Sequence, residues 1–300
     1  MQSVQPEAAS GRSDEQNARP IARALPRLHP SVRVASMTPT MLEPVLGASI
    51  DGAGADVAAL LRRLYRTMAT VRRIDREAVV LRGRGILPGY LDSRGREAVQ
   101  VGAVLALQTS RDRAFPARHE PGMMIALGAD PAAALHAGRA RIDAALEGSV
   151  THAVGWALGA KLDRTGGCAL STIGAGAGTA AELRTAVSTA RDSALPVVFL
   201  SGSGRTEGAG MPVLLVDGAD ALAVHAATVQ ALDLARSGSG PVLIDAVLPG
   251  PSAWPARDPL VVCEQRLRAT GTVDDGYFAE VADIADALAD RLRTRFTIGA

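Results

Sequence analysis

Two glycine-rich turns, each at the end of a short apolar stretch, constrain the fold of this 300-residue chain more than any other feature. Residues 168–173 are predicted to form a buried strand that runs into Gly174-Ala175-Gly176-Ala177-Gly178. An alanine-rich helix is expected from about Thr179 to Arg191, and a second strand over residues 196–200 ends in Ser201-Gly202-Ser203-Gly204. Strand, helix and parallel strand in this order form a βαβ unit, so we expect both turns at the same edge of one sheet.

The remaining hydrophobic pattern extends this unit on both sides. Apolar residues at helical spacing predict a long helix over residues 56–82, with Asp56 as its cap. Further helices are expected over residues 95–107, 123–127, 131–146, 152–162, 221–237 and 277–296, and further strands over 213–216 and 242–247. Asp220 is expected to cap the helix over residues 221–237. Residues 115–122 and 249–259 are expected as loops. Strands that alternate with helices predict an α/β fold with a mainly parallel sheet flanked by helices, as a single domain over residues 51–300.

Composition narrows the kind of protein. The net charge of +1 gives no reason to expect a nucleic acid or a membrane surface as a partner. No run of about 18 apolar residues occurs, so we expect no transmembrane helix. The two cysteines, Cys168 and Cys263, are too few for a disulfide framework and fit a reducing compartment, so we expect a cytoplasmic protein.

Residues 1–50 differ from the rest of the chain. They are rich in proline, serine and arginine and lack sustained periodicity or the apolar core of a signal peptide. Acidic residues such as Glu7 and Asp14 count against a transit peptide. We therefore expect a mobile tail, whose later part, around Leu28 to Leu46, wraps a neighbouring surface if it becomes ordered.

Several short motifs follow one another in an order that resembles a known family. They are Leu64-Tyr-Arg-Thr-Met68, Ser93-Arg-Gly-Arg-Glu-Ala-Val-Gln-Val-Gly102, Phe115-Pro116 with Glu120, His152-Ala-Val-Gly155, Val216-Asp-Gly-Ala-Asp220 and Asp258-Pro-Leu260. From about Leu60 to Phe296 the chain resembles the alpha subunit of the thiamine diphosphate-dependent decarboxylating component of 2-oxo acid dehydrogenases, of the pyruvate, branched-chain or acetoin type. The resemblance implies a thiamine diphosphate-binding-type fold with a six-stranded parallel sheet. It also implies an alpha2-beta2 heterotetramer, in which the partners are a beta-type subunit and a second copy of the chain.

The chain departs from this family at the positions that carry chemistry. The family's first glycine turn contains Gly-Asp-Gly and its second contains Asn-Asn, whose oxygens hold the Mg²⁺ that binds the diphosphate. Ala175, Gly202 and Ser203 occupy those positions here. Arg118 and His119 stand where the family has a tyrosine and an arginine that contact the cofactor.

Two further family features are missing. Pro121 replaces a usual histidine, and residues 249–257 replace a longer loop that carries a catalytic histidine in the family. The segment from Gly204 to Pro212 is also far shorter than its family counterpart. We therefore assign no catalytic residue to this chain.

The loss of the metal ligands dominates the interpretation. Mg²⁺ requires oxygen ligands in near-octahedral geometry, and the methyl group of Ala175 provides none. Burying a diphosphate without its cation costs on the order of several kcal/mol. Arg118, His119 and the backbone of Gly174 and Gly176 could form a vestigial anion site. We expect no metal site and no cofactor, with thiamine diphosphate and Mg²⁺ bound only if a partner completes the site.

Other interpretations of the same residues stay open. Residues 174–178 could be a dinucleotide-binding turn, although Thr179 replaces its third glycine, or they could be a purely structural turn. Arg118 and His119 could be an ordinary exposed loop pair. His152 is expected as a cap or interface residue and His225 as a packing residue, whereas His29 and His136 have no partner visible in the sequence. No hydrolase elbow and no zinc-ligand spacing is present.

Three functions remain. The first is a non-catalytic assembly or regulatory partner of a beta-type subunit, with interface contacts through Gly155 and Gly159 and the small residues Ala180, Ala181 and Ala186. The second is a divergent, active thiamine-dependent dehydrogenase or acyloin-forming enzyme whose Mg²⁺ ligands come from Glu182, Glu207 or a partner. The third is a small-molecule or anion sensor that uses the vacated cleft.

Overall fold

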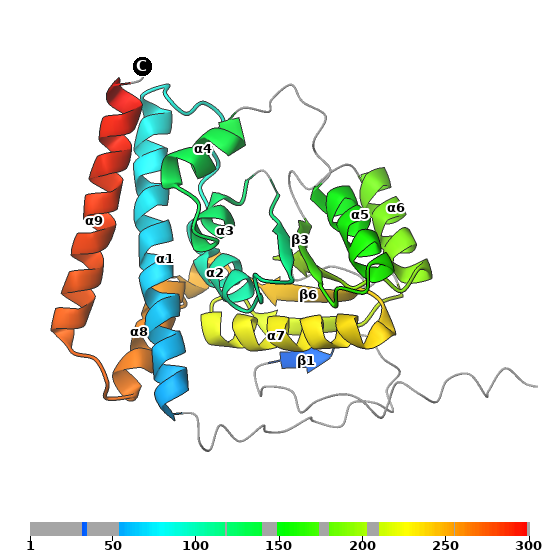
Figure 1. Ribbon diagram of the computed structural model, residues 1–300. Coiled ribbons are helices and arrows are strands. Elements are labelled where there is room, and N and C mark those ends of the chain that lie inside the picture. The colour runs from blue at the N-terminus through cyan, green and yellow to red at the C-terminus, as the bar shows by residue number, and fades with distance from the viewer. Residues whose placement is uncertain are drawn as a thin grey trace, which may run out of the picture.

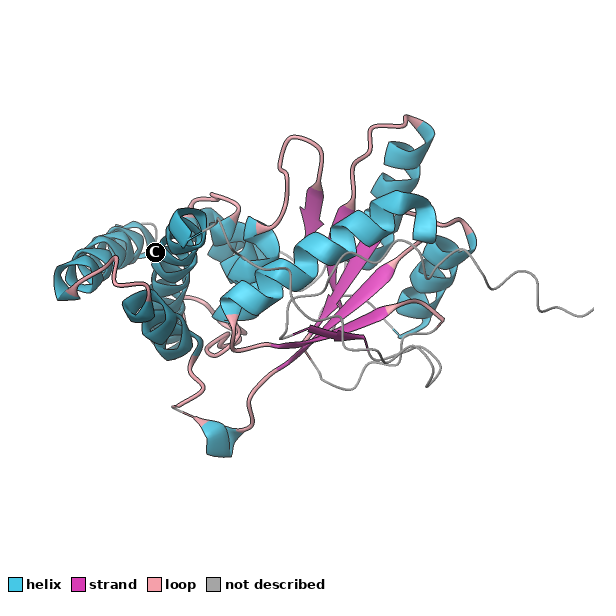
Figure 2. Cartoon of the chain, turned by 90° about the horizontal axis from the view of Figure 1, so that it is seen from below, coloured by secondary structure: helices cyan, strands magenta, loops and turns pink. Residues whose placement is uncertain are grey.

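A twisted sheet lies between two layers of helices in the computed structural model (Figures 1 and 2). The structure describes residues 32–34, 54–117, 119–139, 149–173, 180–202, 210–254 and 256–298. Within these ranges the sheet has the strand order β1-β5-β6-β4-β3-β2. The strands are β1 (Val32–Val34), β2 (Arg113–Phe115), β3 (Ala169–Ile173), β4 (Val197–Ser201), β5 (Val213–Asp217) and β6 (Val242–Val247).

Five of these strands are mutually parallel, which confirms the predicted α/β fold with a mainly parallel sheet. The sixth strand corrects the all-parallel sheet that the resemblance implied: β1 pairs with β5 in the antiparallel direction, with Val32 opposite Val216. Of the predicted N-terminal tail, only Val32–Val34 is described, and the other residues of 1–50 lie outside the described part. Sequence periodicity missed β1 and β2 because three residues are too few to show an alternating pattern.

The helices largely follow the predicted ranges. They are α1 (Gly54–Gly83), α2 (Glu97–Leu105), α3 (Pro121–Ala126), α4 (Pro131–Arg139), α5 (Ser149–Leu162), α6 (Ala180–Asp192), α7 (Ala221–Leu234), α8 (Pro259–Ala269) and α9 (Asp275–Ile298). The carboxylate of Asp220 accepts a hydrogen bond from the amide of Ala223, which confirms the predicted cap of α7. Helix α8 was not predicted, although Asp258 caps it and Pro259 opens it in the usual arrangement of a helix start.

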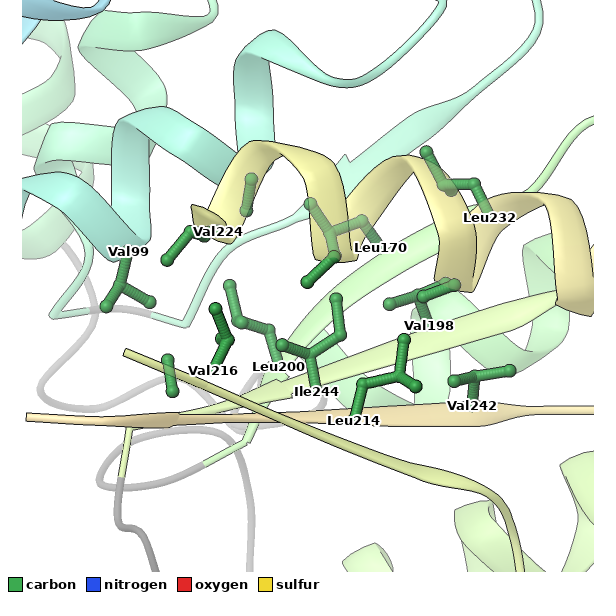
Figure 3. Close-up of a cluster of buried hydrophobic side chains, with 14 of the residues drawn as sticks. Val99, Leu170, Val198, Leu200, Leu214, Val216, Val224, Leu232, Val242 and Ile244 are labelled. Atoms are coloured by element: carbon green, nitrogen blue, oxygen red, sulfur yellow. The ribbon is translucent and has the colours of Figure 1, made fainter. Parts of the chain in front are cut away.

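Both faces of the sheet are buried, each under its own helices. Side chains alternate along a strand, so neighbouring residues enter opposite cores. Leu170, Val198, Leu200 and Ile244 pack with α2 and α7 on one face (Figure 3). On the other face, residues such as Phe199 pack with α5 and α6. Continuous burial explains why the predicted strands read as unbroken apolar runs.

A third group of helices extends the molecule beyond the sheet. Helices α1 and α9 lie side by side at one end, with α8 against the lower part of α1 (Figure 1). Their shared core includes Leu64, Met68, Cys263 and Leu267. In the described part of the chain, no helix is both long and apolar enough to cross a membrane.

Candidate functional site

The carboxyl ends of β2, β3 and β4 meet at one edge of the sheet. The three strands are parallel neighbours, with Phe115 opposite Ser171 and Ile173 opposite Ser201. This confirms that the two strands of the predicted βαβ unit end together, where α/β folds place ligands. The turn residues Gly174, Ala175, Gly176 and Ser203 lie outside the described residues, as does Arg118.

The loop after β2 is fixed to this edge by polar contacts. The amide of Ala117 donates a hydrogen bond of 2.6 Å to the hydroxyl of Thr172 on β3. The amide of Glu120 donates to the carbonyl of Ala117 at 3.0 Å, and α3 follows immediately. His119, one of the predicted vestigial site residues, lies in this loop and is partly exposed. The loop is therefore anchored at Ala117 and again at Glu120.

The Glu120 carboxylate lies in a buried polar cluster that the sequence did not predict. It accepts hydrogen bonds from the side chains of Arg96 and Gln100 on the α2 side. Burial raises the pKa of Glu120 above its usual value, and the positive charge of Arg96 partly offsets this. The two motifs that contain these residues were recognised in the sequence, but the contact between them was not. A negative charge at this position does not favour an anionic ligand.

Gly122 permits the close contact between this loop and α2. A Cβ atom at residue 122 would lie 2.0 Å from Oε1 of Gln100 and 2.8 Å from Cγ1 of Val71. No side chain fits there without movement of its neighbours. The start of α3 therefore packs directly on the side chains that hold Glu120.

A second buried cluster joins three distant motifs at the same side of the molecule. Arg72 on α1 donates two hydrogen bonds to Asp258, at 2.9 and 3.1 Å, and one to Glu97. Glu97 also accepts a 2.8 Å hydrogen bond from the amide of Gly95. The ring of Trp254 lies close to the Arg72 guanidinium, 5.8 Å from the ring centre. These contacts fix the connection between β6 and α8.

Comparison with known proteins agrees with this arrangement of motifs. The family model described as "Dehydrogenase E1 component" matches residues 200–248. The 2-oxoisovalerate dehydrogenase subunit alpha of Bacillus subtilis is 29% identical, over 61% of this chain and 69% of that protein. The 3-methyl-2-oxobutanoate dehydrogenase subunit alpha of Mycobacterium tuberculosis is 32% identical, over 62% and 60%. The pyruvate dehydrogenase E1 component subunit alpha of Zymomonas mobilis is 28% identical, over 62% and 64%.

The chain is a relative of these alpha subunits. The resemblance recognised in the sequence is therefore confirmed. The match covers between 60% and 69% of the length of these three relatives.

The described residues of this alpha-subunit relative do not fit a magnesium-held diphosphate. Gly202, the residue directly after β4, has no side chain that could bind a metal. A Cβ atom added there would meet only Leu248, at 3.5 Å. In the described ranges, no three or more His, Cys, Asp or Glu side chains are grouped so that they could hold a metal ion. The carboxylate of Glu120 is already bound to Arg96 and Gln100. At this edge the described part of the chain therefore offers separate carboxylates, such as Glu120 and Asp245, and no grouped set of metal ligands.

The other described histidines of this alpha-subunit relative lie on three different helices. His152 is exposed in the first turns of α5, and His225 is partly buried on α7. His136, for which the sequence shows no partner, stacks its ring on that of Phe296 in α9, with 4.6 Å between the ring centres. The contact joins residues from distant parts of the chain, so no local pattern shows it. His29 lies outside the described residues.

One face of α5 is covered by nothing in the described chain. Gly155 and Gly159 have no heavy atom within 4 Å of an added Cβ, and Leu158 and Leu162 are 41% and 72% exposed. Ala180 and Ala181 at the start of α6 are exposed as well. Ala186 was predicted to belong to the same surface, which is wrong: it is 5% exposed and packs in the core beneath α5 and α6.

Proposed function

We propose that this alpha-subunit relative is a non-catalytic assembly or regulatory partner of a beta-type subunit, in an alpha2-beta2 heterotetramer. The observation that carries this proposal is the uneven retention of family features. Motifs of the family order are present and buried contacts join them, as in the pairing of Arg72 with Asp258. The positions of the family's metal ligands carry Ala175, Gly202 and Ser203, which offer neither a carboxylate nor an amide side chain.

The exposed glycines of α5 support an interface. A glycine inside a helix destabilises it by about 0.5–1 kcal/mol relative to alanine. Within the described chain nothing lies near enough to Gly155 or Gly159 to require the missing side chain. A partner that approaches the α5 backbone closely would account for both residues. The exposed side chains of Leu158 and Leu162 would then become buried against it.

The cofactor and the location follow from this proposal. The assembly role needs no cofactor, so none is expected in the complex; thiamine diphosphate with Mg²⁺ would bind only if a partner supplied the missing ligands, which is the enzymatic alternative. Both cysteines are buried and free, which supports a cytoplasmic location. We propose no contact with nucleic acid or membrane.

The test is co-expression of the full chain with a beta-type subunit, followed by purification through a tag on the beta-type subunit. Light scattering coupled to size exclusion then measures the mass of the complex. The proposal predicts a complex with two copies of each chain. Recovery of the chain as a monomer, with none retained on the tagged subunit, would refute the proposal.

One observation favours the enzymatic alternative. Glu182 lies in the first turn of α6, close in sequence to the glycine turn, and its exposed carboxylate could replace the missing aspartate. Glu207, the other predicted ligand, lies outside the described residues. Turnover of a 2-oxo acid that depends on thiamine diphosphate and Mg²⁺, and that is lost in Glu182→Gln, would establish this alternative.

A further inference from the structure

A cavity of about 280 Å³ lies at the opposite edge of the sheet, away from the candidate site. Its lining includes Gly167, just before β3, Pro196, just before β4, and Gly238, in the turn that leads to β6. These segments mark the amino ends of three parallel strands. Nothing in the proposed assembly role uses this cavity.

The lining is basic. Lys161, Arg164 and Arg236 are among the lining residues, and the other described lining residues are glycine, alanine and proline. No acidic residue is among the described residues that line the cavity. A small cavity with three positive side chains and an otherwise neutral lining has the chemistry of an anion site.

Two of the three positive charges already have partners. The ammonium of Lys161 donates to the carbonyls of Ser193 and Ala194, at 2.6 and 3.2 Å, which leaves a third donor. Arg236 forms ion pairs with Asp112 at 2.6 Å and Asp233 at 3.0 Å. Its Nε is nevertheless buried, with no hydrogen-bond partner among the described residues.

Arg164 differs from the other two. Within the described part of the chain its guanidinium makes no hydrogen bond or ion pair that would neutralise its charge. Arg164 is exposed, lines the cavity and lies two residues after the end of α5. Arg164 therefore brings a positive charge to the cavity that the protein itself does not use.

The backbone at Arg164 is strained. Arg164 and Ala194, with φ of 55° and 44°, are the non-glycine residues with positive φ in the described chain, and both line this cavity. Each ends a helix: the amide of Thr165 bonds to the carbonyl of Ala160, and that of Leu195 to Ala190. Glycine is the usual residue at such a helix end, because a side chain there is disfavoured.

Helix capping explains only part of this arrangement. The carbonyl ends of α5 and α6 lie nearby and carry partial negative charge, which basic side chains neutralise. Lys161 does this directly, through its two carbonyl contacts. Arg164 occupies a strained position that glycine would fill more favourably, yet its guanidinium caps no carbonyl in the described chain. Unlike Ala194, the strained residue Arg164 also carries a charge without a partner in the described chain, and strain and charge together suggest a function for its side chain.

We propose that this cavity binds a small oxyanion, the phosphate or carboxylate group of a metabolite, through Arg164 and the third donor of Lys161. Ligand cavities usually measure about 300–1,000 Å³, so the ligand is at the small end of that range. The proposal is independent of the assembly role and does not involve the thiamine diphosphate edge.

The sequence offers a direct probe, because Lys161 is the only lysine of the chain. An amine-acetylating reagent therefore labels Lys161 and the terminal amine, and peptide mass spectrometry separates the two. Acetylation of the full chain is measured in inorganic phosphate, in succinate and in sodium chloride of equal ionic strength. At a ligand concentration ten times Kd, binding slows the labelling of Lys161 about tenfold, since about one site in eleven stays empty. The terminal amine is the internal reference.

Two variants separate binding from folding. Arg164→Gly removes the charge and the backbone strain together, so it is expected to fold, to melt at a higher temperature and to lose the protection of Lys161. Ala194→Gly relieves the same kind of strain without a change of charge, so it is expected to melt at a higher temperature and keep the protection. Protection by phosphate alone or by succinate alone supports the proposal and identifies the anion. Equal labelling in all three salts, or equal protection in Arg164→Gly and the unchanged chain, overturns it.

Discussion

The guanidinium of Arg72 holds the carboxylate of Asp258 through two hydrogen bonds, at 2.9 and 3.1 Å, where the side chains are 5% and 8% exposed. Asp258 also accepts a hydrogen bond from the amide of Leu260, at 2.9 Å, and so begins α8. One buried ion pair thus sets the position of α8 relative to α1. The Asp-Pro motif recognised in the sequence therefore has a structural role in this chain.

Replacement of Arg72 by methionine is expected to lower the free energy of unfolding by about 3–5 kcal/mol, because it leaves the Glu97 and Asp258 carboxylates buried without a cation. The matched control is Arg295→Met, which breaks an exposed pair with Asp130 and is expected to change stability by no more than about 1 kcal/mol. Urea denaturation measures both. Equal losses in the two variants would show that burial does not determine the strength of the pair.

Gly102 is expected to be a position where alanine is strongly destabilising. A Cβ atom there would lie 2.7 Å from the carbonyl oxygen of Ala221 and 3.0 Å from Cβ of Val224, so α2 and α7 would have to separate. Overpacking of this kind lowers the free energy of unfolding by about 1–3 kcal/mol. Thermal melting followed by circular dichroism is the measurement, and a melting temperature equal to that of the unchanged chain would contradict the close contact.

The double variant Gly155→Ala with Gly159→Ala is expected to have the opposite effect on stability. Each change adds a methyl group into open space within a helix, so the free energy of unfolding of the isolated chain rises by about 0.5–1 kcal/mol per site. The same methyl groups would obstruct a partner that packs on α5, so capture by a tagged beta-type subunit is expected to weaken. A more stable chain that is captured as well as the unchanged one would remove α5 from the proposed interface.

His225 predicts a dependence of stability on pH. Its pKa is lowered from the usual value by burial, and the positive charge of Arg63 on α1 adds to this, whereas its backbone contact at Leu105 acts in the other direction. As the pH falls, the unfolded chain therefore binds a proton at this residue before the folded chain does. The contribution of His225 is fully present above a pH of about 6.5 and declines below it, by at most about 1.4 kcal/mol per pH unit.

The variant His225→Gln isolates this contribution. Unfolding free energies are compared at pH values of about 7.5 and 5.5, on either side of the ordinary pKa of histidine. The unchanged chain is expected to lose more stability over this interval than the variant. Parallel losses would show that His225 titrates alike in the folded and unfolded states.

Prediction from sequence succeeded where the signal was local and long. Helix α1 and strand β6 were recognised from runs of apolar residues at regular spacing. Asp220 was recognised as a helix cap because an aspartate directly before a helical pattern is typical of an N-cap. Helix α8 was missed because four of its apolar residues are consecutive, at residues 260–263, which hides the helical spacing, and because the proline-rich segment before it suggested a loop.

Local sequence patterns did not predict the contacts between residues that are distant in the sequence. The pairing of Arg72 with Asp258 and the stacking of His136 on Phe296 each depend on how helices pack, and neither partner carries a sign of the other. At the candidate site, the strand ends were predicted correctly, whereas the buried contact between Glu120 and Gln100 was not. The resemblance to the family was recognised from the order of the motifs, because that order can be read along the chain without knowledge of any contact.

The most direct test of the central claim is calorimetric titration of thiamine diphosphate with Mg²⁺ into the purified complex of this chain with a beta-type subunit. A complex of that beta-type subunit with a relative that carries Gly-Asp-Gly in its first turn is the positive control. Because Ala175, Gly202 and Ser203 offer no magnesium ligand of the family type, the account predicts no saturable, Mg²⁺-dependent heat from the complex. Saturable binding that Mg²⁺ requires, accompanied by turnover of a 2-oxo acid, would contradict it.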